Sequence, residues 1–334
     1  MTMRVGIDLS PLQLTRAGTA RYLRILLAEL ERRDDVEVAP ISWGGSGRLI
    51  AAVRDAAWYP LALPRAARRV DVLHCPSYRA PFRSPAPLVV TVHDLALLRH
   101  PEVFNRWSRG YRRFAVPRVV RAARLVIAVS DFTRDELVEL LDVDAERIRV
   151  VPNGISGLFT PEGPAGEGDY VLAVGTLEPR KNLHRLIEAT RGLDAELRIA
   201  GRRGWGDVDI DESRVRWLGE VSDAELAVLY RGARCVAYPS LYEGFGYPVV
   251  EGMACGTPVV TSAGGATEEI AGGAAVLVDP LDPQSIRAGI EEAIAHRDEL
   301  VPKGLARAQA FAPDRFAEAT VAVYREALRD PNAV

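Results

Sequence analysis

The chain has 334 residues, 48% of them hydrophobic, with a formal net charge of −3. Its length exceeds one ordinary α/β domain of about 100–200 residues, so two domains with packed cores are expected. The sequence has no run of the roughly 18 consecutive apolar residues that a membrane-spanning helix needs, so no such helix is expected. The N-terminus lacks the zones of a signal peptide, and we expect a cytoplasmic protein.

In the first half of the chain, short β-rich runs alternate with helical ones, which is typical of a parallel sheet. Leu23, Leu26, Leu27 and Leu30 fall on one helical stripe between the first strand and the next. The Pro- and Gly-rich residues 151–169 then predict a linker between domains. We expect strands in VGIDL (5–9), VDVLH (70–74), LVVTVHD (88–94), LVIAVS (125–130) and IRVV (148–151).

A second alternating series follows the linker. The pair Ser222 and Glu225 has the spacing of a capping box that opens a helix. Residues 312–330 predict a last helix that packs back on the first domain. Strands are expected in YVLAVG (170–175), AELRIAG (195–201), VRWLG (215–219), RCVAYPS (234–240), PVVTS (258–262) and AAVLVDP (274–280).

Two such series predict two doubly wound α/β domains that face a cleft. We place the first domain at 1–158 together with the helix 314–334, and the second at 159–313. Ligands of these sheets bind beyond the carboxyl ends of the strands, against helix N-termini. The glycine-rich stretches 44–47 and 264–265 match neither a dinucleotide fingerprint nor a P-loop, so dehydrogenase and P-loop functions lack their central motif.

The strongest local signal is PSLYEGFGYPVVEGMACGTPVVTS, residues 239–262. Glu243 and Glu251 are separated by seven residues, and Pro248 suits the first turn of a helix that stops at Gly256. The residues 244–246 leave backbone N–H groups exposed at the positive end of that helix, which attracts phosphates and sugar hydroxyls. Two carboxylates at the same helix end can accept hydrogen bonds from a polyol. Taken singly, each acid could equally be a capping or solvent-facing residue.

This segment resembles the Glu-x7-Glu signature of retaining glycosyltransferases of family 4, the mannosyltransferase-like group 1 enzymes, which have the two-domain GT-B fold. The resemblance extends over essentially the whole chain. It implies that Glu243 and the loop residues Gly244, Phe245 and Gly246 hold the donor sugar, with Glu243 in a catalytic role. It also implies that Glu251 binds the ribose.

A second motif, VGTLEPRKNLHRLIEA at 174–189, follows a predicted strand and opens a helix. It resembles the diphosphate site of the same family, with Arg180 and Lys181 as the cations. Cations placed where the leaving diphosphate gains charge are a large catalytic contribution. Many members carry a further basic residue where this chain has Thr176, which leaves the clamp to Arg180 and Lys181. Without the resemblance, Arg180 and Lys181 could also be an exposed pair of charges at the start of a helix.

Two weaker signals lie in the first domain. Gly18 precedes the leucine-striped helix and resembles the family's glycine loop, which approaches the diphosphate, although a simple turn explains it as well. His93 ends a predicted strand, where the family often places a catalytic His near the donor sugar. The alternative for His93 is a hydrogen-bonded, partly buried histidine.

We predict no metal site and no cofactor. The acids Asp207, Asp209 and Asp211 superficially resemble a metal-binding Asp-x-Asp, but they lie in a Gly- and Trp-rich loop and read as surface acids. Arg180 and Lys181 would neutralise the diphosphate in place of a metal. The cysteines Cys75, Cys235 and Cys255 lack metal-ligand spacing and predict buried, reduced thiols.

Charge is divided unevenly along the chain. Residues 1–160 hold 24 Arg and Lys against 17 Asp and Glu, whereas the remaining residues hold 18 against 28. The segment Arg106–Arg124 carries seven arginines and no acid. A basic amphipathic helix of this kind can contact an anionic membrane or acceptor, and it can equally be a solvated helix face.

The implied activity is transfer of a hexose, with retention of configuration, from a nucleotide diphosphate sugar to a hydroxyl group. We favour GDP-mannose as the donor, with a UDP-hexose as the alternative, and a glycan, lipid-linked or small-molecule acceptor. No nucleic acid partner is expected, and peripheral membrane contact would use Arg106–Arg124. Two other classes stay open from the residues alone, namely a sugar-nucleotide epimerase and a non-catalytic sugar-binding protein.

Overall fold

The computed structural model describes residues 2–14, 18–45, 47, 50, 53–100, 106–204 and 215–329. The chain divides into two compact units. Unit 1 contains the residues up to Gly154 and those from Pro313 onward, and unit 2 contains Ile155–Ala312. Along the described residues, no helix is both long enough and apolar enough to cross a membrane.

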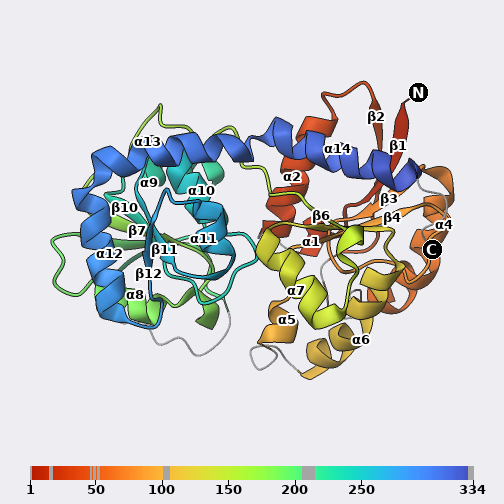
Figure 1. The fold of residues 1–334 in the computed structure, drawn as a ribbon, viewed down its shortest axis with the longest axis horizontal. Coiled ribbons are helices and arrows are strands. Elements are labelled where there is room, and N and C mark those ends of the chain that lie inside the picture. The colour runs from red at the N-terminus through yellow and green to blue at the C-terminus, as the bar shows by residue number, and fades with distance from the viewer. Residues whose placement is uncertain are drawn as a thin grey trace. The chain divides into compact units, whose positions relative to one another are not determined.

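Unit 1 is built on a parallel sheet of six strands in the order β2-β1-β3-β4-β5-β6 (Figure 1). Because all strands run in the same direction, their carboxyl ends lie at one edge of the sheet. The interior strands are buried on both faces, as their continuous apolar runs predict. The strands are β1 (Met3–Asp8), β2 (Val36–Ile41), β3 (Val72–Cys75), β4 (Leu88–Val92), β5 (Leu125–Ala128) and β6 (Ile148–Val150).

Two apolar clusters cover the two faces of this sheet. On one face, the leucine stripe of α2 packs with α14, with Leu23, Leu26 and Leu30 all but fully buried. On the other face lie side chains of η1, α4, α6 and α7. The helical segments are α1 (Ser10–Leu14), α2 (Gly18–Leu30), η1 (Arg54–Ala62), α4 (Leu63–Ala66), η2 (Ala67–Arg69), α5 (Ala96–Arg99), α6 (Arg106–Ala122), α7 (Asp131–Leu141), η4 (Ala145–Arg147) and α14 (Pro313–Arg329).

The last helix, α14, belongs to unit 1 as predicted (Figure 1). A buried polar chain joins it to the sheet. The Tyr324 hydroxyl lies 2.7 Å from His74 Nδ1, and His74 Nε2 lies 2.9 Å from the Thr91 hydroxyl. Burial lowers the pKa of His74 to about 3, so the imidazole is neutral at physiological pH. The chain of hydrogen bonds therefore fixes α14 against β3 and β4 without burying a charge.

Unit 2 repeats the architecture with the strand order β12-β11-β10-β7-β8-β9, again all parallel (Figure 1). Its strands are β7 (Tyr170–Val174), β8 (Glu196–Ala200), β9 (Val215–Gly219), β10 (Cys235–Tyr238), β11 (Val259–Ser262) and β12 (Val276–Val278). Its helical segments are η5 (Pro179–Lys181), α8 (Leu183–Ala189), α9 (Asp223–Gly232), α10 (Tyr247–Ala254), α11 (Gly265–Ala271), α12 (Pro283–Ala295), α13 (Arg297–Ala308) and η7 (Gln309–Phe311).

Most predicted elements are present with small shifts at their ends. The capping box is confirmed, because Ser222 caps α9 and Glu225 bonds back to it. The prediction omitted β2, which contains Glu37 and Pro40 and alternates rather than forming an apolar run. β2 is the edge strand of its sheet, where proline is tolerated since one side has no ladder partner. The three cysteines are buried and free, as predicted.

Candidate active site

Two predicted motifs of unit 2 meet in one ionic cluster. Lys181 Nζ donates to Glu243 Oε1 at 2.5 Å, and Arg180 Nη1 donates to Glu243 Oε2 at 2.9 Å. Arg180 Nη2 also lies 2.8 Å from Glu178 Oε1. The Glu243 side chain is only 9% exposed, and that of Lys181 is 11% exposed. The sequence placed these residues in separate motifs, and the fold joins them.

Local backbone geometry brings the cations to this place. Lys181 ends the short segment η5, and Asn182 follows with φ 58°, a left-handed conformation that asparagine tolerates. The Asn182 amide donates to the Pro239 carbonyl at 3.0 Å, which ties the segment to the end of β10. Gly175 follows β7, and a Cβ there would lie 3.4 Å from the Lys181 side-chain carbons Cδ and Cε. The Lys181 side chain therefore runs over a residue that has no side chain.

Two further residues hold the Glu243 carboxylate, and the sequence analysis missed both. The hydroxyl of Tyr238 donates to Glu243 Oε1 at 2.8 Å, and that of Ser240 donates to the same atom at 2.6 Å. Lys181 Nζ in turn donates to the Tyr238 hydroxyl at 2.6 Å. Their position at the carboxyl end of the predicted strand 234–240 was the available signal, since ligand-binding groups gather there.

The charges of this cluster determine its protonation. Burial alone would raise the pKa of Glu243, but the Arg180 and Lys181 charges, with hydrogen bonds from Lys181 and Ser240, overcome it and hold the pKa at about 2. Burial also lowers the pKa of Lys181, against the opposing effect of Glu243. Glu243 is therefore an ionised carboxylate at neutral pH, unable to act as a proton donor.

The loop between β10 and α10 is buried at residues 244–246, whereas the sequence predicted backbone N–H groups left exposed at the helix start. Gly246 has φ 97° and caps α10, and a Cβ there would lie 3.0 Å from Thr267 Cγ2. Phe245 is 4% exposed, and its ring packs edge-on against Tyr247 and Phe311. Any contact of Phe245 with a sugar would thus involve its backbone. α10 has proline in its first turn and ends just before Gly256, as predicted.

Glu251, the predicted ribose ligand, lies inside α10 and is fully buried. Its Oε2 atom accepts a hydrogen bond from the Tyr230 hydroxyl at 2.9 Å. In this conformation the carboxylate fastens α10 to α9. The ribose contact stays a prediction, and it requires Glu251 to become accessible.

Unit 1 carries the two remaining predicted residues. His93 follows β4 at the carboxyl edge of the sheet, and its Nε2 atom lies 3.0 Å from the Pro76 carbonyl oxygen. Burial lowers the His93 pKa more than that carbonyl raises it, so the ring is neutral at physiological pH. The Tyr22 ring packs edge-on against His93, with centroids 5.0 Å apart. Gly18 is the first residue of α2, the helix that also carries Tyr22.

Among the described residues, no group of three His, Cys, Asp or Glu side chains could hold a metal ion. The acids Asp207, Asp209 and Asp211 lie outside the described residues. Arg180 and Lys181, the predicted diphosphate ligands, are both paired with carboxylates in this structure.

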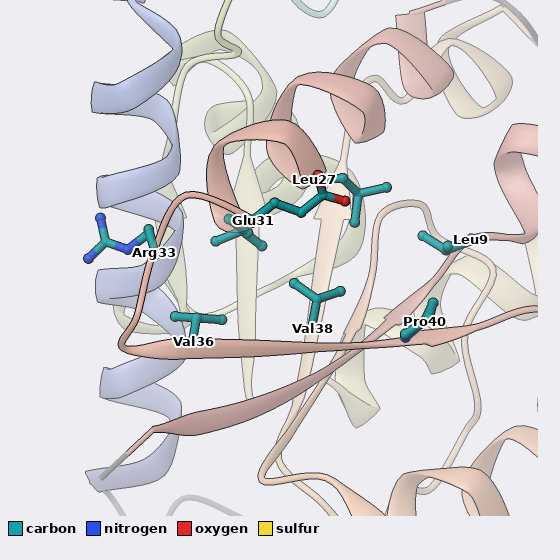
Figure 2. Close-up of a pocket in the computed structure, with 8 residues that line it drawn as sticks. Leu9, Leu27, Glu31, Arg33, Val36, Val38 and Pro40 are labelled. Carbon is teal, nitrogen blue, oxygen red and sulfur yellow. The ribbon is translucent and has the colours of Figure 1, made fainter.

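A pocket in unit 1 lies elsewhere, between α2 and the edge strand β2 (Figure 2). Its lining is mainly aliphatic, and it contains no residue that the sequence singled out for chemistry. It is lined by Leu9, Leu27, Leu30, Glu31, Arg33, Val36, Val38 and Pro40.

The chain matches two family models in succession. Residues 16–156 match the model described as Glycosyltransferase Family 4, and residues 158–303 match Glycosyl transferases group 1. It is 32% identical over 282 residues to the O-antigen chain mannosyltransferase B of Escherichia coli, covering 76% of this chain and 74% of the relative. It is also 32% identical to the O-antigen chain mannosyltransferase RfbU of Salmonella typhimurium, over 60% of this chain and 59% of that relative.

The fold is also that of solved structures. Anabaena HepE, in a crystal structure with UDP and glucose, superposes with a TM-score of 0.76 at 21% identity, over 97% of this chain and 100% of that one. This likeness supports the fold, two parallel six-stranded α/β units. The chain belongs to the group 1 glycosyltransferases of family 4, and it is a hexosyltransferase with the GT-B fold.

Proposed function

We propose that this protein transfers mannose from GDP-mannose, with retention of configuration, to a hydroxyl group of a glycan, glycolipid or small-molecule acceptor. Similarity to two O-antigen mannosyltransferases supports the choice of sugar. The observation that carries the reaction class is the cluster of Arg180, Lys181 and Glu243 at the carboxyl end of β10. A UDP-hexose donor is the alternative, favoured by the structural likeness to a protein solved with UDP and glucose.

The proposed reaction needs no metal or cofactor. The bond between the anomeric carbon and the diphosphate oxygen breaks, and the acceptor oxygen bonds to that carbon on the same face. The acceptor proton passes to an oxygen of the leaving diphosphate. Arg180 and Lys181 would stabilise the charge that develops on that diphosphate.

Glu243 would act by charge rather than by proton transfer. Its carboxylate is ionised, because two cations hold its pKa low. It would orient the donor sugar and favour positive charge on the ring. Arg180 and Lys181 donate hydrogen bonds to Glu243 in this structure. When a diphosphate binds, they would also donate hydrogen bonds to the phosphate oxygens.

Binding of nucleotides tests the donor. We expect GDP and GDP-mannose to raise the melting temperature more than UDP and UDP-glucose do, because a ligand stabilises the state that binds it. A larger shift with UDP and UDP-glucose would reassign the donor to a UDP-hexose. No shift with any of the four would overturn the nucleotide-sugar site.

Variants test the cluster. Lys181→Ala should lower transfer by about a hundredfold or more, as the loss of a charge-stabilising group commonly does. The control is Lys303→Ala, which removes an exposed lysine that pairs with Glu299 on the surface of the same unit. Near-normal turnover in both Lys181→Ala and Glu243→Gln would remove the assigned roles. A loss of turnover supports these roles when the melting curve shows that the variant is folded at the assay temperature.

We also infer peripheral membrane contact through α6, part of the arginine-rich segment Arg106–Arg124. On its described part, Arg113, Arg118 and Arg121 are exposed beside Phe114, which is 52% exposed. Cations around an exposed aromatic ring suit an anionic lipid surface. Side chains of residues 106–112 lie outside the described part, and the inference does not use them.

A further inference from the structure

A group of buried hydrogen-bond donors lies in unit 1, away from the residues assigned so far. Arg54 opens η1 and is completely buried, and its Nε, Nη1 and Nη2 atoms have no hydrogen-bond partner in the described part of the chain. Four residues further along η1, the indole Nε1 of Trp58 is also buried without a partner. Four donor nitrogens within one turn therefore lack an acceptor among the described residues.

The carboxylate of Asp8, whose charge interacts with Arg54, does not supply this acceptor. Asp8, the last residue of β1, accepts from the Ser10 backbone N–H at 3.0 Å and from the Tyr59 hydroxyl at 3.1 Å. Burial raises the pKa of Asp8, and the charge of Arg54 lowers it only in part. The neighbouring Asp55 lies 3.7 Å from Arg79. The charges of Arg54 and Asp8 therefore interact, but Arg54 donates no hydrogen bond to Asp8.

The glycine-rich stretch after β2 passes over the guanidinium. Gly44 is exposed and has φ 86°, and a Cβ on it would lie 3.9 Å from Arg54 Nη1. A Cβ on Gly45 would meet no atom within 4 Å. Trp43 stacks on Trp58 with ring centroids 6.1 Å apart and is itself 38% exposed. The Arg54 guanidinium therefore lies close to an exposed glycine backbone, next to the Ile50 side chain, whose Cγ2 would lie 2.7 Å from a Cβ on Gly44.

The position of this group connects it to the transfer reaction. Asp8 ends β1, Trp43 and Gly44 follow β2, and His93 follows β4 in the same parallel sheet. The donors therefore lie at the sheet edge that also carries His93, the edge at which ligands of such sheets bind. Helices of the π type, such as η1, also occur frequently at functional sites.

A buried guanidinium without a partner is strongly unfavourable, so its presence calls for an acceptor that arrives with a ligand. Its five N–H groups form a planar fork that matches the oxygens of a phosphate or carboxylate. The Trp58 N–H can only donate, which again selects an acceptor-rich group. The surrounding groups therefore specify an oxyanion.

We propose that Arg54 and Trp58 form a subsite in unit 1 that binds a phosphate group of the acceptor substrate, beneath Gly44 and beside the stacked Trp43. This inference rests on the proposed glycosyl transfer, since it assigns the bound phosphate to the acceptor. The subsite makes the enzyme select phosphorylated acceptors, and a carboxylated acceptor is the alternative source of the same oxyanion chemistry.

Inorganic phosphate, malonate and chloride at equal ionic strength serve as probes, with melting temperature as the readout. All proteins in the comparison carry Lys181→Ala, so that the donor site contributes less to anion binding. We expect phosphate to stabilise this protein, and Arg54→Met to weaken the apparent phosphate affinity at least tenfold. Arg69→Met is the matched control, because it removes an exposed arginine of the same unit. Trp58→Phe provides a second variant, with a smaller loss expected.

The outcomes separate this inference from the proposed function. Arg54→Met should keep or raise the melting temperature without anion, because methionine replaces an unpaired buried charge. A strong fall would instead make Arg54 a structural partner of Asp8 and overturn the subsite. Equal phosphate stabilisation with and without Arg54 would overturn it as well, and stabilisation by malonate alone would replace phosphate with a carboxylate. Arg54→Met is also made in the protein that keeps Lys181. If this variant binds GDP or UDP as tightly as the wild type does, recognition of the donor does not depend on Arg54.

Discussion

At the residue scale, Glu243 has an unusual environment for a carboxylate. It receives hydrogen bonds from Lys181, Arg180, Tyr238 and Ser240, and its side chain is almost buried. A carboxylate so placed is costly to neutralise, because protonation would remove the negative partner of the buried Lys181 and one of the carboxylates that pair with Arg180. Its charge is therefore a fixed feature of the site.

This environment predicts a pH dependence of stability. The folded-state pKa of Glu243 is about 2, below its ordinary value of 4.5, so the folded protein favours the ionised form. The resulting stabilisation, on the order of 3 kcal/mol, is present above pH 4.5 and lost as pH falls toward 2. Urea denaturation of the wild type and Glu243→Gln at several pH values measures it.

The expected result is a difference in unfolding free energy that shrinks as pH is lowered from 6 to 3. Acid destabilises other groups in both proteins, and only the difference between them reports Glu243. A difference that stays constant over this range would contradict a carboxylate held ionised by Arg180 and Lys181.

At the element scale, α10 determines where the loop residues 244–246 lie. It packs closely on the sheet because Gly252 has no side chain, and a Cβ there would lie 2.9 Å from Val236 Cγ2 and 3.2 Å from Val259 Cγ2. The buried Glu251 then fastens the helix to Tyr230 on α9. The helix is short, with eight residues, so its position depends on these contacts rather than on helix propensity.

We therefore expect Gly252→Ala to destabilise unit 2 by about 1–3 kcal/mol, the usual cost of overpacking a core. Alanine favours the helix by up to about 1 kcal/mol, which offsets part of this cost. Gly157→Ala is the control, because a Cβ at that position would meet no atom within 4 Å. Equal unfolding midpoints for the two variants would show that α10 can move away from the sheet without cost.

At the scale of the whole molecule, charge is the property that separates the two halves of the sequence. Residues 1–160 carry an excess of basic residues and the remainder an excess of acidic ones. Part of the basic excess is exposed on α6, at Arg113, Arg118 and Arg121. Like charges gathered on one helix attract an anionic surface, and salt weakens that attraction.

Flotation on vesicles with an anionic phospholipid tests this proposal. We expect the wild type to float at low salt, and the triple substitution of Arg113, Arg118 and Arg121 to glutamate to reduce the floated fraction at least fivefold. The control replaces Arg191, Arg203 and Arg216, exposed arginines of unit 2, in the same way. Failure of the wild type to bind at low salt would discard the membrane contact.

Much of this protein was predictable from local sequence. Apolar runs, the leucine stripe of α2 and the capping box of α9 act over a few residues, and the structure confirms each. The edge strand β2 was missed because its pattern is interrupted by Glu37 and Pro40, and its pairing with β1 depends on residues far away in the chain. The predicted class of enzyme followed from two short motifs, and the family comparison confirms it.

The sequence by itself determined the two α/β series, the family and the identity of the charged residues in each motif. Only the tertiary structure decided that Lys181 and Glu243, 62 residues apart, share a hydrogen bond, and that Glu251 is buried against Tyr230. The tertiary structure also buries Arg54, whose nitrogen atoms have no acceptor among the residues that the structure describes. Local patterns report propensity and periodicity, whereas ion pairing and burial depend on which strands become neighbours in the sheet.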